Sequence, residues 1–180
     1  MDYSDDPGAV QVSIDYTYEN DTATYSGTAT DGWGGTDTLM YIDQVGGSAY
    51  GDQFTITLND VDGDLDNMFA VQGNAGADSI TGTADQDVAA VHFDDPSAVS
   101  VDLGAGTAVD GWGNTDVLTD IEIAGGSDHG DTLTGSTGSD GFIATLGNDT
   151  ITGGDGDYDW VYYGWDNDAN GVAGVQVDMA

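Results

Sequence analysis

The chain has 180 residues, 34 acidic side chains and no lysine or arginine, which gives a formal net charge of −34. A chain without basic side chains cannot neutralise phosphates, which argues against nucleic acid as a partner. It has no cysteine, so disulfides are excluded. It also shows neither an apolar run of roughly 18 residues nor a basic leader, so we expect no membrane span and no cleaved signal peptide.

Aspartate accounts for all but two of the 34 acidic residues, the exceptions being Glu19 and Glu122. A salt-adapted surface can use either acid, whereas a tight metal-binding turn needs the short side chain, which also tolerates left-handed backbone. The bias therefore favours turns and ligands over a halophilic surface. Because no ion pair with lysine or arginine is possible, bound metal cations are the obvious means of holding these carboxylates together.

The first predicted element is a strand over residues 9–14, where apolar and polar residues alternate, and the same pattern recurs at 98–103 and 174–179. Residues 27–55 align without gaps to 106–134, with 17 identities in 29 positions. We interpret the chain as a fragment of a longer repeat protein. The predicted organisation is one continuous solenoid domain with a first unit at 1–97, a second at 98–173 and the start of a third at 174–180.

Four consecutive nine-residue blocks fill residues 126–161, with Asp at the sixth position of the first three and an apolar or aromatic residue at the eighth position of all four. A block of this length can hold a six-residue turn and a three-residue strand. Successive blocks would lie on alternate edges, so that turns stack 18 residues apart. Asp131 and Asp149 should then face one ion. Asp140 should face position 158, which is Tyr158, so we expect Asp159, one residue later, to serve instead, with Asp157 also near.

The nine-residue rhythm also appears at 73–81 and 82–90, and residues 56–72 interrupt it. No helical period is present. The predicted fold is therefore all-β, a right-handed parallel β-roll or β-helix solenoid with glycine-rich turns.

Carboxylate and backbone carbonyl oxygens, without Cys or His, favour calcium over transition metals. We expect several Ca²⁺ ions as the only cofactor. The candidate ligands are the sixth-position aspartates and two neighbours, namely Asp37, Asp52, Asp78, Asp87, Asp116, Asp131, Asp140, Asp149, Asp157 and Asp159.

The stretch LGNDTITGGDGD at 146–157 and the segment at 99–136 resemble the RTX, or hemolysin-type, calcium-binding repeat family. The resemblance implies export by type I secretion and an extracellular or cell-surface location. It also implies a chain that stays unfolded in the low-calcium cytoplasm and folds on meeting extracellular calcium. Departures from the family pattern include His129 and Tyr158, each at a position where the family has another residue.

The function predicted on this basis is a calcium-binding structural repeat domain of a secreted protein. One alternative is an adhesin or surface-layer segment that binds a cell surface, a glycan or its own copies end to end. Others are a stabilising or secretion module of a secreted enzyme, and a halophilic domain folded by salt. Trp33 and Trp112 are expected to pack on adjacent strands rather than stack on sugar. His92 and His129 have no nucleophile-like partner, so we do not expect an enzyme.

Overall fold

The computed structural model describes residues 1–19, 22–60, 68–84 and 88–163. Within these ranges every regular element is a β-strand, and the strands form two sheets, neither of which closes on itself. The all-β prediction is therefore confirmed. The described residues include no helix long and apolar enough to cross a membrane.

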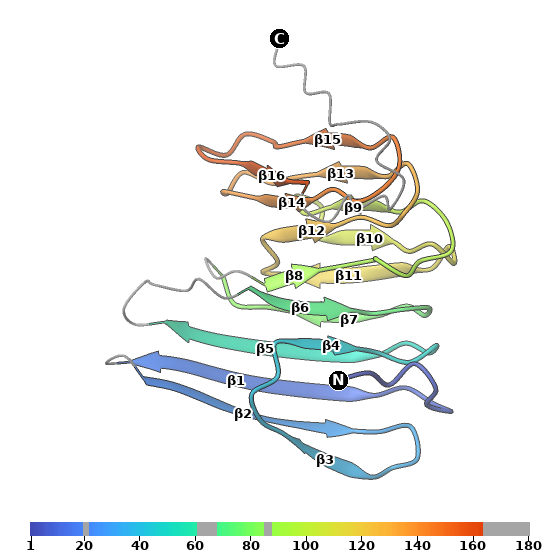
Figure 1. The fold of residues 1–180 in the computed structure, drawn as a ribbon, viewed down its shortest axis with the longest axis vertical. Helices are drawn as coiled ribbons and strands as arrows, with labels where there is room; N and C mark the ends of the chain where they lie inside the picture. The colour runs from blue at the N-terminus through green and yellow to red at the C-terminus, as the bar shows by residue number, and fades with distance from the viewer. Residues whose placement is uncertain (20–21, 61–67, 85–87, 164–180) are drawn as a thin grey trace.

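The larger sheet has ten strands in the order β15-β13-β9-β10-β11-β7-β5-β1-β2-β3. They stack along the long axis of the molecule from β3 at one end to β15 at the other (Figure 1). In chain order the strands are β1 Gln11–Glu19, β2 Thr22–Thr30, β3 Thr36–Leu39, β5 Gln53–Asp60, β7 Ser79–Thr81, β9 Ser100–Asp102, β10 Thr107–Val109, β11 Thr115–Thr119, β13 Thr132–Thr134 and β15 Thr150–Thr152.

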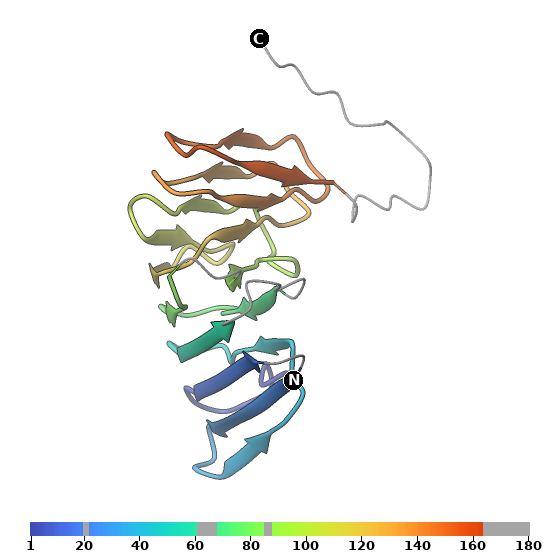
Figure 2. The same ribbon diagram turned by 90° about the vertical axis from the view of Figure 1, so that its left-hand side faces the viewer.

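The smaller sheet has six strands, all parallel, in the order β16-β14-β12-β8-β6-β4. Figure 2 shows it as a second layer facing the first. Its strands are β4 Gln44–Gly46, β6 Phe69–Gln72, β8 Val88–Ala90, β12 Ile123–Gly125, β14 Gly141–Ile143 and β16 Trp160–Tyr162.

The nine-residue blocks place successive strands in alternate sheets. Strands β12, β13, β14 and β15 are three residues long and begin at 123, 132, 141 and 150. The spacing within one sheet is therefore 18 residues, and Thr132 pairs with Thr150. Leu133 and Phe142, at the eighth positions, are fully buried. The predicted turn-and-strand division and the 18-residue stacking are both confirmed here.

The larger sheet is not parallel throughout, which corrects the expectation of an all-parallel fold. Strands β1, β2 and β3 pair antiparallel, and so do β9, β10 and β11. The connections at 31–35 and 110–114 are tight turns, and a connection this short can join only antiparallel strands. The two hairpins occupy equivalent places in the duplicated segments.

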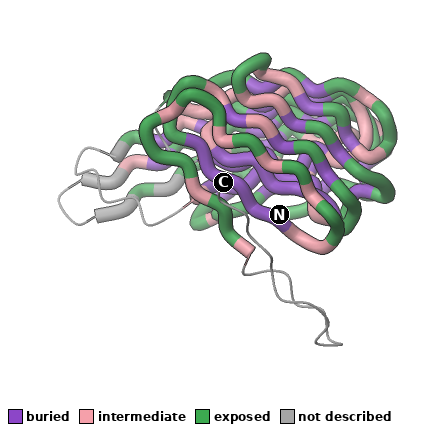
Figure 3. Tube along the Cα trace, turned by 90° about the horizontal axis from the view of Figure 1, so that it is seen from above, coloured by how far each residue is buried: buried purple, intermediate pink, exposed green. Residues whose placement is uncertain are grey.

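The core lies between the two sheets. Phe54 and Ile56 of β5, Leu133 of β13 and Phe142 of β14 are at most 1% exposed. Figure 3 shows buried residues along the interior and exposed residues around the turns. The interruption at 56–72 begins within the eight-residue strand β5, which pairs with the nine-residue strand β1.

Candidate functional site

Three of the predicted ligands form a continuous row, the carboxylate ladder of Asp52, Asp78 and Asp116. They lie at the same edge of three adjacent strands, β5, β7 and β11. The backbone N–H of Asp52 donates to Oδ1 of Asp78 (2.7 Å), and the N–H of Asp78 donates to Oδ1 of Asp116 (2.9 Å). Since adjacent strands are about 4.8 Å apart, the ladder stacks like charges at close range.

The carboxylate ladder begins at Val10, whose N–H donates to Oδ1 of Asp52 (2.7 Å). A second, shorter row has the same form. The N–H of Val99 donates to Oδ1 of Asp131 (2.8 Å), and the N–H of Asp131 donates to Oδ1 of Asp149 (3.0 Å). Asp131 and Asp149 therefore lie in successive turns, as their spacing predicts.

On the opposite edge, Asp140 meets Asp159. The N–H of Asp140 donates to Oδ1 of Asp159 (3.0 Å), and Gly141 of β14 pairs with Trp160 of β16. The step between these turns is thus 19 residues, which places Asp159 rather than Tyr158 beside Asp140. Tyr158 is 70% exposed.

A six-residue motif, the Gly-Ser-x-x-x-Asp box, supplies hydrogen bonds to three of the predicted ligands, Asp52, Asp131 and Asp140. The sequence interpretation did not identify the role of its serine. The N–H of Ser127 donates to Oδ2 of Asp131 (2.6 Å), and its hydroxyl donates to Oδ1 (2.8 Å). A Cβ on Gly126 would collide with the same Oδ2, so the carboxylate requires glycine there. The repetition of this box at 47–52, 126–131 and 135–140 is a signal present in the sequence alone.

Burial changes the ionisation of the carboxylate ladder. Asp52, Asp78 and Asp116 are 1%, 2% and 1% exposed. Burial is the largest cause of a raised pKa in this row, and it raises the pKa of Asp78 to about 8 and that of Asp116 to about 6. The hydrogen bonds from the backbone N–H groups of Asp52 and Asp78 act in the opposite direction and lower these two pKa values. Burial also raises the pKa of Asp52, which hydrogen bonds from Val10 and Ser48 oppose. Oδ2 of Asp78 has no hydrogen-bond partner.

The remaining predicted ligands are dispersed. Asp37 lies in β3 and accepts a hydrogen bond from the hydroxyl of Tyr3 (3.0 Å). Asp157 is exposed in the turn before β16. Asp87 lies outside the described residues.

No group of three or more His, Asp or Glu side chains in the described ranges is arranged to hold a metal ion. Two kinds of oxygen atom in the described residues could serve as ligands of a hard cation. One is the unpartnered buried Oδ2 of Asp78. The other is the backbone carbonyls of stacked turns, where the oxygen of His129 lies against Gly147 and that of Asn148 against Gly130. An ion at these turns would draw on carbonyl oxygens as well as carboxylates.

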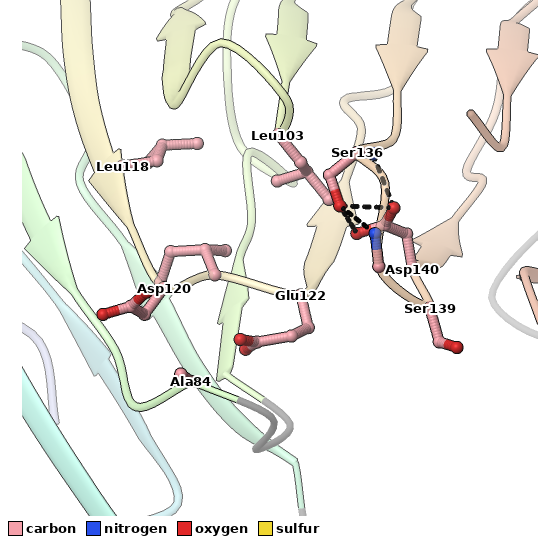
Figure 4. A pocket seen from close by; sticks show the side chains of 10 residues that line it. Ala84, Leu103, Leu118, Asp120, Glu122, Ser136, Ser139 and Asp140 are labelled. Carbon is pink, nitrogen blue, oxygen red and sulfur yellow. Dashed lines mark hydrogen bonds between the residues drawn. The ribbon is translucent and has the colours of Figure 1, made fainter. Parts of the chain in front are cut away.

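A pocket opens on the edge away from the carboxylate ladder, between the segment after β11 and the turn before β14. Asp120, Glu122 and Asp140 line it. Figure 4 shows Asp140 turned toward Ser136, to which it is hydrogen bonded, while Asp120 and Glu122 point away from it. The three carboxylates do not converge on one point.

The two tryptophan turns are equivalent and project their indoles outward. Oδ1 of Asp31 accepts from the N–H of Trp33 (3.0 Å), and Oδ1 of Asp110 accepts from that of Trp112 (3.0 Å). Trp33 is 69% exposed and Trp112 is 46% exposed. The expectation that these side chains pack on adjacent strands is wrong for Trp33 and holds only in part for Trp112.

Comparison of this chain with protein-family models gave no match, and comparison with curated proteins gave none either.

Proposed function

We propose that this chain is a calcium-binding structural repeat domain of a secreted protein, of the hemolysin-type repeat class. In this proposal the two sheets are the walls of a right-handed parallel β-roll into which antiparallel hairpins are inserted. Calcium ions between stacked turns join one turn to the next, and the domain folds and becomes rigid when it reaches extracellular calcium.

The observation that carries the proposal is the carboxylate ladder. Asp52, Asp78 and Asp116 are buried one strand apart, and the chain has no lysine or arginine to compensate them. A buried carboxylate without a partner cation shifts its pKa upward and takes up a proton instead of remaining charged. A bound cation would allow the same carboxylates to ionise and would convert binding free energy into folding free energy.

Calcium is favoured because the available donors are oxygens and the turns stack backbone carbonyls beside carboxylates. Ca²⁺ accepts six to eight oxygen ligands in flexible geometry, whereas Mg²⁺ demands a nearly ideal octahedron and keeps its waters. A row of turns supplies many oxygens with variable spacing, which suits the larger ion.

Far-UV circular dichroism during a calcium titration tests this function, with magnesium and molar KCl as controls. A cooperative coil-to-β transition that calcium alone produces is the expected result. Equal folding in KCl would support the salt-folded alternative, and a chain that is equally folded in EDTA at neutral pH would refute the proposal.

The site assignment is tested by Asp149→Ala, with Asp128→Ala as its matched control. Asp149 accepts from the N–H of Asp131 in the preceding turn, whereas Asp128 is an exposed residue of the 126–131 turn. We expect Asp149→Ala to raise the calcium midpoint of folding by about tenfold or more, since a lost charged acceptor costs about 1.5 kcal/mol or more. Equal midpoints for the two variants would contradict the assignment.

A second candidate function, an adhesin or surface-layer segment, is favoured by the exposure of Trp33 and Trp112. Two equivalent turns present aromatic surface to solvent, and aromatic residues are enriched at interfaces. A glycan array and light scattering of the calcium-loaded chain would test it. Binding or end-to-end assembly that Trp33→Ala abolishes would support this function, and its absence in both assays would exclude it.

A further inference from the structure

The ten-stranded sheet ends in two strands, and within the described residues each of them is paired on one side only. β3 is the last strand at one end of the sheet and β15 is the last strand at the other. Figure 1 shows them at opposite ends of the long axis of the molecule. Neither strand contains proline or lysine, the residues that commonly block an edge. An edge of this kind is a template on which another strand can pair.

The chain already makes, in its interior, the pairing that these two edges would make with each other. β11 is the counterpart of β3, because residues 106–134 repeat residues 27–55. β7 is the counterpart of β15, because the sequence Asp-Ser-Ile-Thr-Gly at 78–82 corresponds to Asp-Thr-Ile-Thr-Gly at 149–153. β7 and β11 pair in parallel. The β7–β11 pair is therefore a template for a pair between β15 and β3.

The backbone of β15 is oriented like that of β7. The N–H of Ser79 donates back to β5 (2.9 Å), while the carbonyl of Asp78 accepts from the N–H of Val117 in β11 (2.8 Å). In β15 the N–H of Thr150 likewise donates back to β13 (2.8 Å). Because the backbone groups of successive residues point to opposite sides of a strand, the carbonyl of Asp149 is directed to the open edge.

The backbone of β3 presents the complementary groups. In β11 the N–H of Leu118 donates across the hairpin to the carbonyl of Gly106 (2.9 Å), so that the N–H of Val117 is directed to β7. Thr38 is the counterpart of Val117, and its N–H is therefore directed to the open side of β3. Since Val117 lies opposite Ser79, the template places Thr38 opposite Thr150.

The side chains at the two ends fit the same pairing. Ile80 in β7 has a strand on each side and is 2% exposed, whereas its counterpart in β15, Ile151, is only half-buried. The template sets Ile151 beside Leu39, an apolar contact that would complete its burial. It also sets the N–H of Asp149 beside the carboxylate of Asp37, as the N–H in the same place in β7 meets a carboxylate of β11.

We propose that β15 of one copy of this chain pairs in parallel with β3 of a second copy, and that the chain assembles head to tail. Two different surfaces at opposite ends are joined, so the interface is heterologous and the product is an open row of copies. Each copy carries a formal charge of −34, so calcium or salt should strengthen the association by screening repulsion. The proposal defines an interface for end-to-end assembly, and it rests on strand pairing rather than on the tryptophan turns or on a calcium site.

Sedimentation velocity of the full chain over a range of concentrations tests the assembly. The measurement is made in calcium or in KCl, whichever gives a folded far-UV spectrum, so that failure to assemble is distinct from failure of calcium-dependent folding. We expect a mass that rises with concentration beyond that of a dimer. A folded chain that remains a monomer at every concentration would overturn the proposal, whatever else covers the two edges.

Thr38→Pro tests the pairing edge, since proline is tolerated on an edge strand when its nitrogen faces outward. It should raise the dissociation constant about tenfold or more, because it removes one hydrogen bond and adds the bulk of the ring. Thr36→Pro is the matched control, on the same edge but outside the stretch that corresponds to Val117–Thr119 of β11. Assembly that both variants leave unchanged would overturn the proposal.

Cysteine cross-linking tests the register, because the chain has no cysteine of its own. Thr38→Cys combined with Thr150→Cys should give a ladder of disulfide-linked multimers under mild oxidation. Thr38→Cys combined with Thr152→Cys should not, since the two positions would be about 8 Å apart in this register, beyond the reach of a disulfide. Equal cross-linking of the two pairs, or dimers from Thr38→Cys alone, would contradict the head-to-tail register.

Discussion

Replacing Asp78 by asparagine should stabilise the protein in EDTA at neutral pH. Burial raises the pKa of this carboxyl to about 8, while that of aspartate in an unfolded chain is about 3.9. At pH 7 the folded chain therefore binds a proton that the unfolded chain does not. Taking up that proton costs about 4 kcal/mol, since each pH unit above 3.9 adds about 1.36 kcal/mol.

The amide removes this cost because it is neutral at every pH. Its oxygen can still accept from the N–H of Asp52, which lies 2.7 Å from Oδ1 of Asp78. Its NH₂ replaces Oδ2, which has no partner, and a buried unsatisfied donor costs about 1–3 kcal/mol. The net gain expected at pH 7 is about 2 kcal/mol.

The sign of the pH dependence follows from the raised pKa. A carboxyl whose folded pKa exceeds its unfolded pKa destabilises the fold progressively as the pH rises between those two values, here from about 4 to about 8. At pH 4 the proton costs below about 0.5 kcal/mol, so the unsatisfied NH₂ dominates and Asp78→Asn should destabilise the fold by about 1.5 kcal/mol. The two effects should balance at about pH 5.4, by the same about 1.36 kcal/mol per pH unit, and the advantage of the variant should grow from there toward pH 8.

Far-UV circular dichroism in EDTA from pH 4 to 8, with urea titrations wherever the chain is folded, measures this effect. The pH at which half the β signal is lost should be higher for Asp78→Asn than for wild type. Asp128→Asn removes the same charge from an exposed turn position and is the control. Equal midpoints for Asp78→Asn and wild type, or an equal gain in the control, would refute the reasoning. In saturating calcium the order should reverse if Asp78 is a ligand.

Two other substitutions test the turns and the core by urea unfolding in calcium. Gly126→Ala should cost about 2 kcal/mol or more, because the new Cβ meets the carboxylate of Asp131, whereas Gly138→Ala, which meets only a serine hydroxyl at 3.4 Å, should cost less than about 1 kcal/mol. A smaller loss at Gly126 than at Gly138 would show that the carboxylate moves freely. Phe142→Ala should lower the free energy of unfolding by about 3–5 kcal/mol because the ring is fully buried. Its control, Tyr158→Ala at a 70% exposed position, should lower it by about 0.5 kcal/mol or less. Comparable losses of stability in the two variants would contradict the placement of the core.

The local rhythm of the sequence determined much of this fold. A period of nine with Gly and Asp in the turn and an apolar eighth residue sets a three-residue strand and an inward side chain, whatever the chain does elsewhere. Leu133 and Phe142 are buried for that reason, and Asp131 meets Asp149 because two blocks return the chain to the same edge. The Gly-Ser-x-x-x-Asp box was equally readable, since its hydrogen bonds span only four residues.

Only the tertiary structure decided how separate stretches adjoin. Asp78 meets Asp116 across 38 residues because β11 folds back as a hairpin and pairs with β7, and no local period specifies that register. The burial that raises the pKa values of Asp78 and Asp116 in the carboxylate ladder results from this pairing. Spacing identifies which residues occupy turns, but the charges that a buried group faces depend on strands distant in sequence.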